Sequence, residues 1–161
     1  MNATPVGSDT QGLIARLDWA SSPLGAAHTW PQSLRTAMDI MLHSPMPMAL
    51  LWGPQLCQLY NDAFARLIGD KHPRTFGQPT HLAWPELKAA TETIYEQVLQ
   101  GHGHACRDQQ WRVPFAGRLC DVWLDLTYSP VHDEGGHVAG LLVTAIETSE
   151  RRRLTQEFER R

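Results

Sequence analysis

Apolar and polar residues alternate most regularly between positions 118 and 150, where the pattern predicts a β-hairpin. Two apolar runs, 119–131 and 137–146, flank the segment Asp133-Glu134-Gly135-Gly136, whose adjacent glycines permit the positive φ angles of a tight turn. Every second residue of the first run is apolar, as in a strand with one packed face. These residues are Val122, Leu124, Leu126 and Tyr128. The second run is almost entirely apolar or small, which predicts a central strand with both faces covered.

Two helices are predicted before the first strand. Ser8 or Asp9 can cap the first, whose apolar residues share one face. These residues are Leu13, Ile14 and Leu17. The second begins near Pro31 and carries apolar residues at the spacing i, i+3, i+4, i+7 and i+8. They are Leu34, Ala37, Met38, Met41 and Leu42. These two helices are the natural cover for the second apolar face of the central strand.

The middle of the chain predicts strands that are interrupted by helices. In order, the elements are strands 48–52 and 56–60, a short helix that Asn61 can cap and Gly69 ends, a longer helix 87–100, and strand 105–115. The hairpin described first then completes the sheet, and a charged helix, 151–161, follows it. An antiparallel sheet with its helices inserted after the second strand is an α+β arrangement.

Composition narrows the class of protein. The chain has 161 residues, of which 42% are hydrophobic and 19% charged, as expected for one globular domain with appended helices. The net charge is -3, so we expect no basic surface that would bind nucleic acid. The apolar runs are too short to span a membrane, and the N-terminus lacks the pattern of a signal peptide. We therefore expect a cytoplasmic protein without membrane insertion.

Several short motifs along the chain occur in the order found in one known protein family. The segment 60–69, YNDAFARLIG, is similar to the passage from that family's second strand into its first inner helix. Phe76-Gly77-Gln78-Pro79 resembles its next short element, and Tyr128-Ser129-Pro130-Val131 with the glycine turn resembles its last hairpin. Glu147-Thr148-Ser149 stands where the family often has an acidic residue and a threonine before its exit helix. With these motifs the chain resembles the PAS domain, a bacterial sensory module. The resemblance implies a PAS fold, a five-stranded antiparallel sheet with inserted helices.

The resemblance also implies a division of the chain and a role. We expect an N-terminal helical cap at 1–45, the PAS domain at 46–147 and the start of a signalling linker helix at 148–161. The segment from Asp18-Trp19 to Arg35 is similar to the leader of a PAS subgroup found ahead of bacterial histidine kinases. The implied role is that of an input domain, without enzymatic activity of its own, that regulates a C-terminal output domain, as in a histidine kinase of a two-component system.

Transmission and pairing can be assigned to particular residues. Any shift of the last strand must pass through Glu147, Thr148 and Ser149 to reach the exit helix. Leu154 and Phe158 lie four apart on that helix and share a face, as at the start of a two-helix seam. PAS modules commonly pair through helices of this kind, so we expect a homodimer through the exit helix and through the N-terminal stripe of Leu13, Ile14 and Leu17.

The aromatic residues of the chain have two interpretations. Four aromatic residues could line a pocket between helix and sheet, where aromatic walls with polar tips are usual. They are Tyr95, Trp111, Trp123 and Tyr128. The same side chains could equally form a filled core, which is the favoured interpretation because any packed domain of this size requires such residues. The alternatives are therefore a sensor of a small molecule and a dimerisation module without a ligand.

No cofactor is predicted, and haem is the alternative. Some PAS domains bind haem through a histidine on or beside the long inner helix, but helix 87–100 contains none, so His81 and His102 are the only candidates. The His102-Gly103-His104 pair lacks a nearby third ligand, and we expect no metal site. Flavin photochemistry of the light-sensing PAS type needs a cysteine in the inner helices, and none lies between Cys57 and Cys106.

Overall fold

One antiparallel sheet of five strands forms the centre of the computed structural model, which describes residues 8–160. Its spatial order is β2-β1-β5-β4-β3, so the last strand of the chain lies in the middle. The strands are β1 (Met48–Trp52), β2 (Cys57–Tyr60), β3 (His104–Phe115), β4 (Arg118–His132) and β5 (Val138–Glu147). The predicted α+β fold and the central position of the last strand are confirmed.

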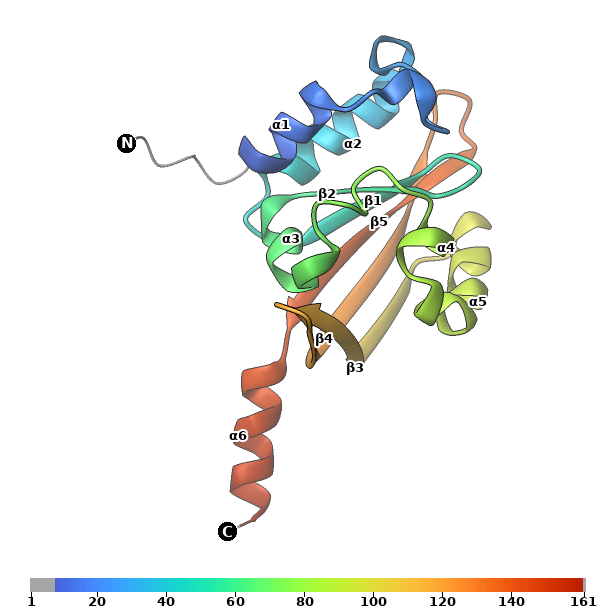
Figure 1. The fold of residues 1–161 in the computed structure, drawn as a ribbon. Helices are drawn as coiled ribbons and strands as arrows, with labels where there is room; N and C mark the ends of the chain where they lie inside the picture. The colour runs from blue at the N-terminus through green and yellow to red at the C-terminus, as the bar shows by residue number, and fades with distance from the viewer. Residues whose placement is uncertain (1–7, 161) are drawn as a thin grey trace.

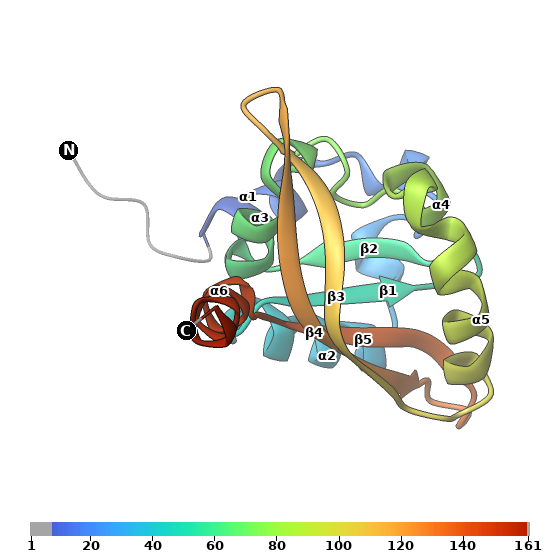
Figure 2. The ribbon, with the colours of Figure 1, turned by 90° about the horizontal axis from the view of Figure 1, so that it is seen from below.

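Helices lie on both faces of the sheet. The N-terminal helices α1 (Ser8–Arg16) and α2 (Gln32–His43) lie on one face (Figure 1). The other face carries the inserted helices α3 (Asp62–Ile68), α4 (Thr80–Ala83) and α5 (Lys88–Leu99). Four short 3-10 turns connect these elements, η1 (Trp19–Ser21), η2 (Ala27–Thr29), η3 (Gly69–Lys71) and η4 (Pro85–Leu87). Seen from below, α2 lies behind the strands and α5 in front of them (Figure 2).

The exit helix α6 (Ser149–Glu159) leaves the sheet at the end of β5 and extends away from the rest of the fold (Figure 1). Only Thr148 separates it from the strand. Among residues 8–160, no helix has the length and apolar character that crossing a membrane requires.

The hairpin predicted from the alternating pattern is confirmed. In its ladder, Leu126 pairs with Ala145 and Tyr128 with Val143. The turn has Gly136 at φ 82°, a left-handed conformation that glycine adopts without steric cost. The Asp133 carboxylate accepts hydrogen bonds from the backbone N–H of Gly135 and of His137, at 2.9 and 3.0 Å. The turn is therefore held by its own side chain as well as by its glycine.

The core fills both sides of the inner strands. On the face toward α5, side chains such as Leu51, Leu126 and Val143 are almost completely buried. On the opposite face, the Trp52 indole ring packs over Gly140, where an added Cβ would lie 2.6 Å from the ring. That close approach requires a glycine in the central strand, because a larger residue would displace the tryptophan.

Cover on the second face of β5 is incomplete, in contrast to our prediction. Leu142 and Thr144 are half-buried, while Ile146 is 50% exposed. The packing of α2 is concentrated on β1, the neighbour of β5, and α2 ends at His43, so it does not cover the last part of the central strand. An apolar residue is thus left open next to the start of α6.

Asn61 connects three elements at the entrance to the inner helices. Its Oδ1 accepts hydrogen bonds from Phe64 N at 3.0 Å and from Met48 N at 3.2 Å. Its Nδ2 donates to the carbonyl oxygens of Met41 and Met46, both at 2.8 Å. The predicted cap of the short helix is confirmed, and the same amide also fixes the end of α2 against β1.

Candidate functional site

The start of the exit helix is tied to the neighbouring strand β4. The backbone N–H of Thr148 donates to the Trp123 carbonyl oxygen at 2.7 Å, and the Trp123 N–H donates to Ser149 Oγ at 3.1 Å. Thr148 is the N-cap residue of α6 and is only 3% exposed. All three predicted transmission residues therefore adjoin β4: Thr148 and Ser149 bond to Trp123, and Glu147, the exposed last residue of β5, pairs with Leu124 in the ladder.

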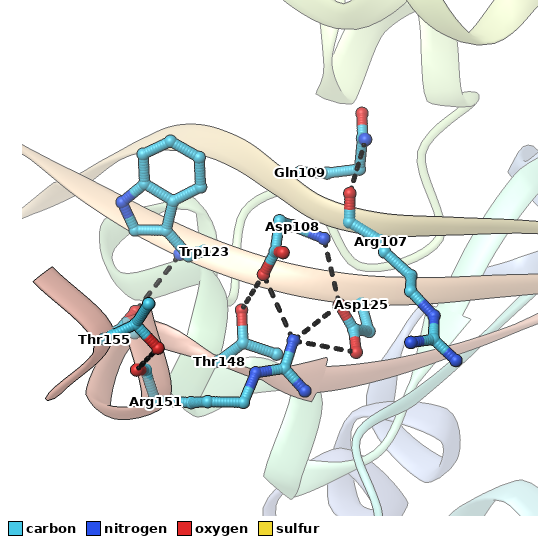
Figure 3. Close-up of polar contacts among 9 residues, drawn as sticks. Arg107, Asp108, Gln109, Trp123, Asp125, Thr148, Arg151 and Thr155 are labelled. Carbon is cyan, nitrogen blue, oxygen red and sulfur yellow. Dashed lines mark hydrogen bonds and ion pairs between the residues drawn. The ribbon is translucent and has the colours of Figure 1, made fainter. Parts of the chain in front are cut away.

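A charged cluster lies beside this connection (Figure 3). The Arg151 guanidinium lies 3.2 Å from Asp108 Oδ1 and 3.4 Å from Asp125 Oδ2. The Thr148 hydroxyl donates to Asp108 Oδ1 at 3.3 Å, and the Asp108 N–H donates to Asp125 Oδ1 at 2.9 Å. We call Asp108, Trp123, Asp125, Thr148 and Arg151 the helix-root cluster. It joins β3, β4 and the first turn of α6.

Backbone geometry places Asp108 in this cluster. The β3–β4 ladder has an irregularity between Cys106 and Gln109, and Asp108 within it has φ 50°. Such a left-handed conformation is uncommon for residues other than glycine, although aspartate tolerates it better than most. The irregularity turns the Asp108 carboxylate toward α6, where it meets Thr148 and Arg151.

The charges of the cluster support one another. The pKa of Asp125 is lowered, first by the hydrogen bond from the Asp108 backbone and then by the nearby Arg151. The pKa of Arg151 is raised, first by its hydrogen bond with Asp108 and then by the charge of Asp125. The Asp125 carboxylate and the Arg151 guanidinium therefore stabilise each other's charged form.

Trp123 lies on the outer side of β4, away from the cavity it was expected to line. The Arg152 guanidinium stacks over its indole ring, with 3.7 Å between the guanidinium carbon and the ring centroid. Side chains alternate across a strand, so Trp123 and Tyr128, five residues apart, must point to opposite faces. Trp123 therefore joins the contacts of the exit helix.

The other three predicted pocket residues do come together. Tyr95, Trp111 and Tyr128 line a cavity between the inner helices and the sheet, with a volume of about 30 Å³. Burial raises the pKa of Tyr128 and of Tyr95, as expected for phenols removed from water. A space of this size holds on the order of one water molecule, so side chains nearly fill the interior.

The haem candidates do not face this interior. His81 is exposed on α4 and lines an open groove on the surface, and His102 is exposed in the turn after α5. Neither histidine lines the cavity of about 30 Å³, which has no space for a porphyrin. Between residues 8 and 160, no three His, Cys, Asp or Glu side chains are grouped so that they could hold a metal ion. The residues present do not fit haem, and the absence of a cofactor stays a prediction.

The N-terminal stripe is largely used within the chain. Leu13 and Ile14 pack against the core, and only Leu17, at 39% exposure, remains open. The Thr10 N–H also donates to Asp62 Oδ1 of α3 at 3.1 Å. Leu13 and Ile14 are thus partly engaged within the chain, and a dimer contact through the stripe stays a prediction.

A hydrogen-bonded chain that the sequence did not reveal fixes α1 to the core. The Tyr60 hydroxyl and His72 Nδ1 lie 2.8 Å apart, and His72 Nε2 and Asp9 Oδ2 lie 2.6 Å apart. A carboxylate only accepts, so His72 Nε2 donates to Asp9. Burial raises the pKa of Tyr60, so the phenol remains protonated and able to donate. Tyr60 and His72 are 12 positions apart, and His72 and Asp9 are 63 positions apart. No local sequence pattern predicts hydrogen bonds over such separations.

The outer part of α6 carries exposed apolar side chains. Leu154 is 51% exposed and Phe158 is 79% exposed. Arg153 and Glu157, four residues apart on this helix, form an ion pair at 2.7 Å. The sequence also puts Arg161 four residues after Glu157, but Arg161 lies outside the described part of the chain. Within residues 8–160, the distal half of this helix has little of its own fold to pack against.

Comparison with known proteins agrees with this architecture. A family model described as the PAS fold matches residues 43–153. The match covers more than half of the chain, which therefore belongs to the PAS family and is a sensory module. No curated protein matches the sequence.

Solved structures show the same fold at low sequence identity. The chain is similar to the PAS domain of BvgS from Bordetella pertussis, with 19% identity, a TM-score of 0.55, and coverage of 80% of this chain and 95% of that one. It is similar to an RNA-binding light-oxygen-voltage receptor, with 18% identity, a TM-score of 0.57 and coverage of 84% of this chain. The chain spans only 38% of that receptor. A LOV protein from Rhodobacter sphaeroides matches with 17% identity, a TM-score of 0.56, and coverage of 73% and 68%.

Proposed function

We propose that this PAS domain is the input module of a larger bacterial signalling protein, a cytoplasmic histidine kinase, and that it regulates a C-terminal output domain through α6. The observation that carries the proposal is the helix-root cluster. Asp108, Asp125 and Trp123 come from β3 and β4, while Thr148 and Arg151 belong to the start of α6. A shift of these strands relative to β5 would therefore change the position of the helix.

The exit helix has the properties of a transmitter. It contains 11 residues, fewer than an isolated helix needs to persist in water, so its order depends on contacts. At its base those contacts are with the helix-root cluster, and its outer face exposes Leu154 and Phe158 for a second copy of the chain. Small changes at the base can then shift a two-state equilibrium of the helix pair. The homodimer and the output domain are both part of the proposal.

Two kinds of signal are compatible with this arrangement. The module can sense a small molecule, or it can relay a conformational change within a dimer without any ligand. The space between the inner helices and the sheet is nearly filled, which supports the relay of a conformational change over the binding of a ligand in that space. Native mass spectrometry of the purified protein separates the two, because a retained small molecule adds mass. An absorption spectrum tests haem, since a Soret band that His81→Ala or His102→Ala abolishes would establish that cofactor.

Deletion of the module from the full-length protein tests the proposed role. Removing residues 1–147 should change the output activity several-fold and leave it fixed under all conditions. An output activity that is the same with and without residues 1–147 would contradict the proposal. The control is a deletion of equal extent that spares the domain and lies outside the output domain.

A further inference from the structure

A second, larger cavity lies on the surface between the β1–β2 turn and the helices α4 and α5. It is an open groove with a volume of about 350 Å³, in the range of small-molecule sites, whereas the interior cavity measures about 30 Å³. Leu56 and Trp84 provide apolar lining, and Tyr95 adds an aromatic ring. The groove can accept a molecule that the interior cannot.

Its rim carries two opposite charges. Lys88 and Glu92 both line the groove and lie four residues apart on α5, so they project from the same face of the helix. Within residues 8–160 neither side chain takes part in a hydrogen bond or an ion pair, and they do not bind each other. Lys88 also stands in the first turn of α5, where a cation is unfavourable for helix stability. The two charges are thus unused by the fold.

We propose that this groove binds an aromatic molecule that carries both a carboxylate and an ammonium group, the charge pattern of an aromatic amino acid. The ring packs against Leu56, Trp84 and Tyr95, the carboxylate pairs with Lys88, and the ammonium pairs with Glu92. The assignment rests on the proposed sensory function and gives it a ligand class and a site outside the helix–sheet interior.

The position of the groove provides a route to the helix-root cluster. Trp84 and Tyr95 line both the groove and the interior cavity, so they separate the two spaces. Tyr95 packs edge-on against Tyr128 of β4, with 6.2 Å between ring centroids. The same strand carries Trp123, whose carbonyl oxygen accepts from Thr148. A ligand that shifts Tyr95 therefore acts on the strand that positions α6.

Calorimetric titration of the purified chain with defined probes tests the proposal. The probes are L-tryptophan, indole-3-propionate, which lacks the ammonium, and L-tryptophanamide, which lacks the carboxylate. We expect L-tryptophan to bind about tenfold more tightly than either analogue, the effect of one lost charge-assisted hydrogen bond. Lys88→Gln should remove the advantage over the amide, and Glu92→Gln should remove the advantage over the propionate. Glu96→Gln, one turn further along α5 and outside the groove, is the matched control.

Each outcome decides the question. Preference for the zwitterion that depends on Lys88 and Glu92, with amide chemical-shift changes at Leu56 and Tyr95, supports the site. The absence of binding by L-tryptophan, L-tyrosine and L-phenylalanine at millimolar concentration overturns it, as does equal binding of the three probes or binding that survives both substitutions. Because this readout involves no output domain, its failure leaves the deletion test of the proposed function unaffected.

Discussion

Replacing Arg151 by glutamine should loosen the first turn of α6 without unfolding the domain. The guanidinium lies 3.2 Å from Asp108 and 3.4 Å from Asp125, and the arginine side chain is 57% exposed. Pairs with this exposure contribute little each, because water screens their charges, so the loss of both should weaken the first turn of α6 only modestly. We expect a roughly fivefold larger population of the open turn at most, and therefore up to roughly fivefold faster amide exchange.

Amide hydrogen exchange of Arg152 measures this opening directly, because its N–H donates to the Thr148 carbonyl oxygen at 2.9 Å. Arg153→Gln is the matched control, since among residues 8–160 the Arg153 side chain pairs only with Glu157 further along the helix. Exchange of the Arg152 amide should accelerate in Arg151→Gln and stay near wild type in Arg153→Gln. Equal exchange in the two variants would refute the role of the helix-root cluster in holding α6.

Three further predictions concern stability, pH and association. Asn61→Ala should cost about 2–4 kcal/mol in urea unfolding, because a helix cap is lost and buried backbone groups lose their partner; an unchanged midpoint would contradict this. Because the pKa of Asp125 is lowered in the folded state, its carboxylate stabilises that state fully at pH values above the ordinary aspartate pKa of about 3.9. This stabilisation is lost as the pH falls through the lower pKa of the folded state. The Arg152 amide shift should therefore be constant from neutral pH to about 4 and change only below it, and Asp125→Asn should abolish that step. Leu154→Glu with Phe158→Glu should convert a dimer to a monomer in light scattering, whereas an unchanged dimer mass would place the interface elsewhere.

The elements of the fold were predictable because their signals are local. The alternation around Leu126 and the two glycines of the turn predicted the last hairpin, and its ladder is confirmed. Asn61 before a short apolar helix predicted a cap, and the cap is present. Both signals depend on residues within a few positions of each other, where the regular repeat of a helix or a strand determines which side chains share a face.

The site was less predictable because its contacts join distant segments. Asp108 belongs to the helix-root cluster because of an irregularity in β3, and no pattern in the sequence predicts this irregularity. His72 binds Asp9 across 63 positions. The sequence pattern does not show this contact, so the apolar residues of α1 were predicted to be free for pairing. Trp123 is a different case, since the alternation of β4 already placed it opposite Tyr128. Its assignment to the pocket conflicted with a pattern that the sequence itself contains.

The most direct test of transmission through the helix root is the output activity of the full-length protein with Thr148→Pro. Proline removes the N–H that donates to the Trp123 carbonyl at 2.7 Å and forces φ from -115° toward about -65°. We predict that this variant has the output activity of the protein that lacks residues 1–147, while the isolated domain keeps the circular dichroism of a folded sheet. Output activity that remains at the wild-type level, with normal folding, would contradict the account.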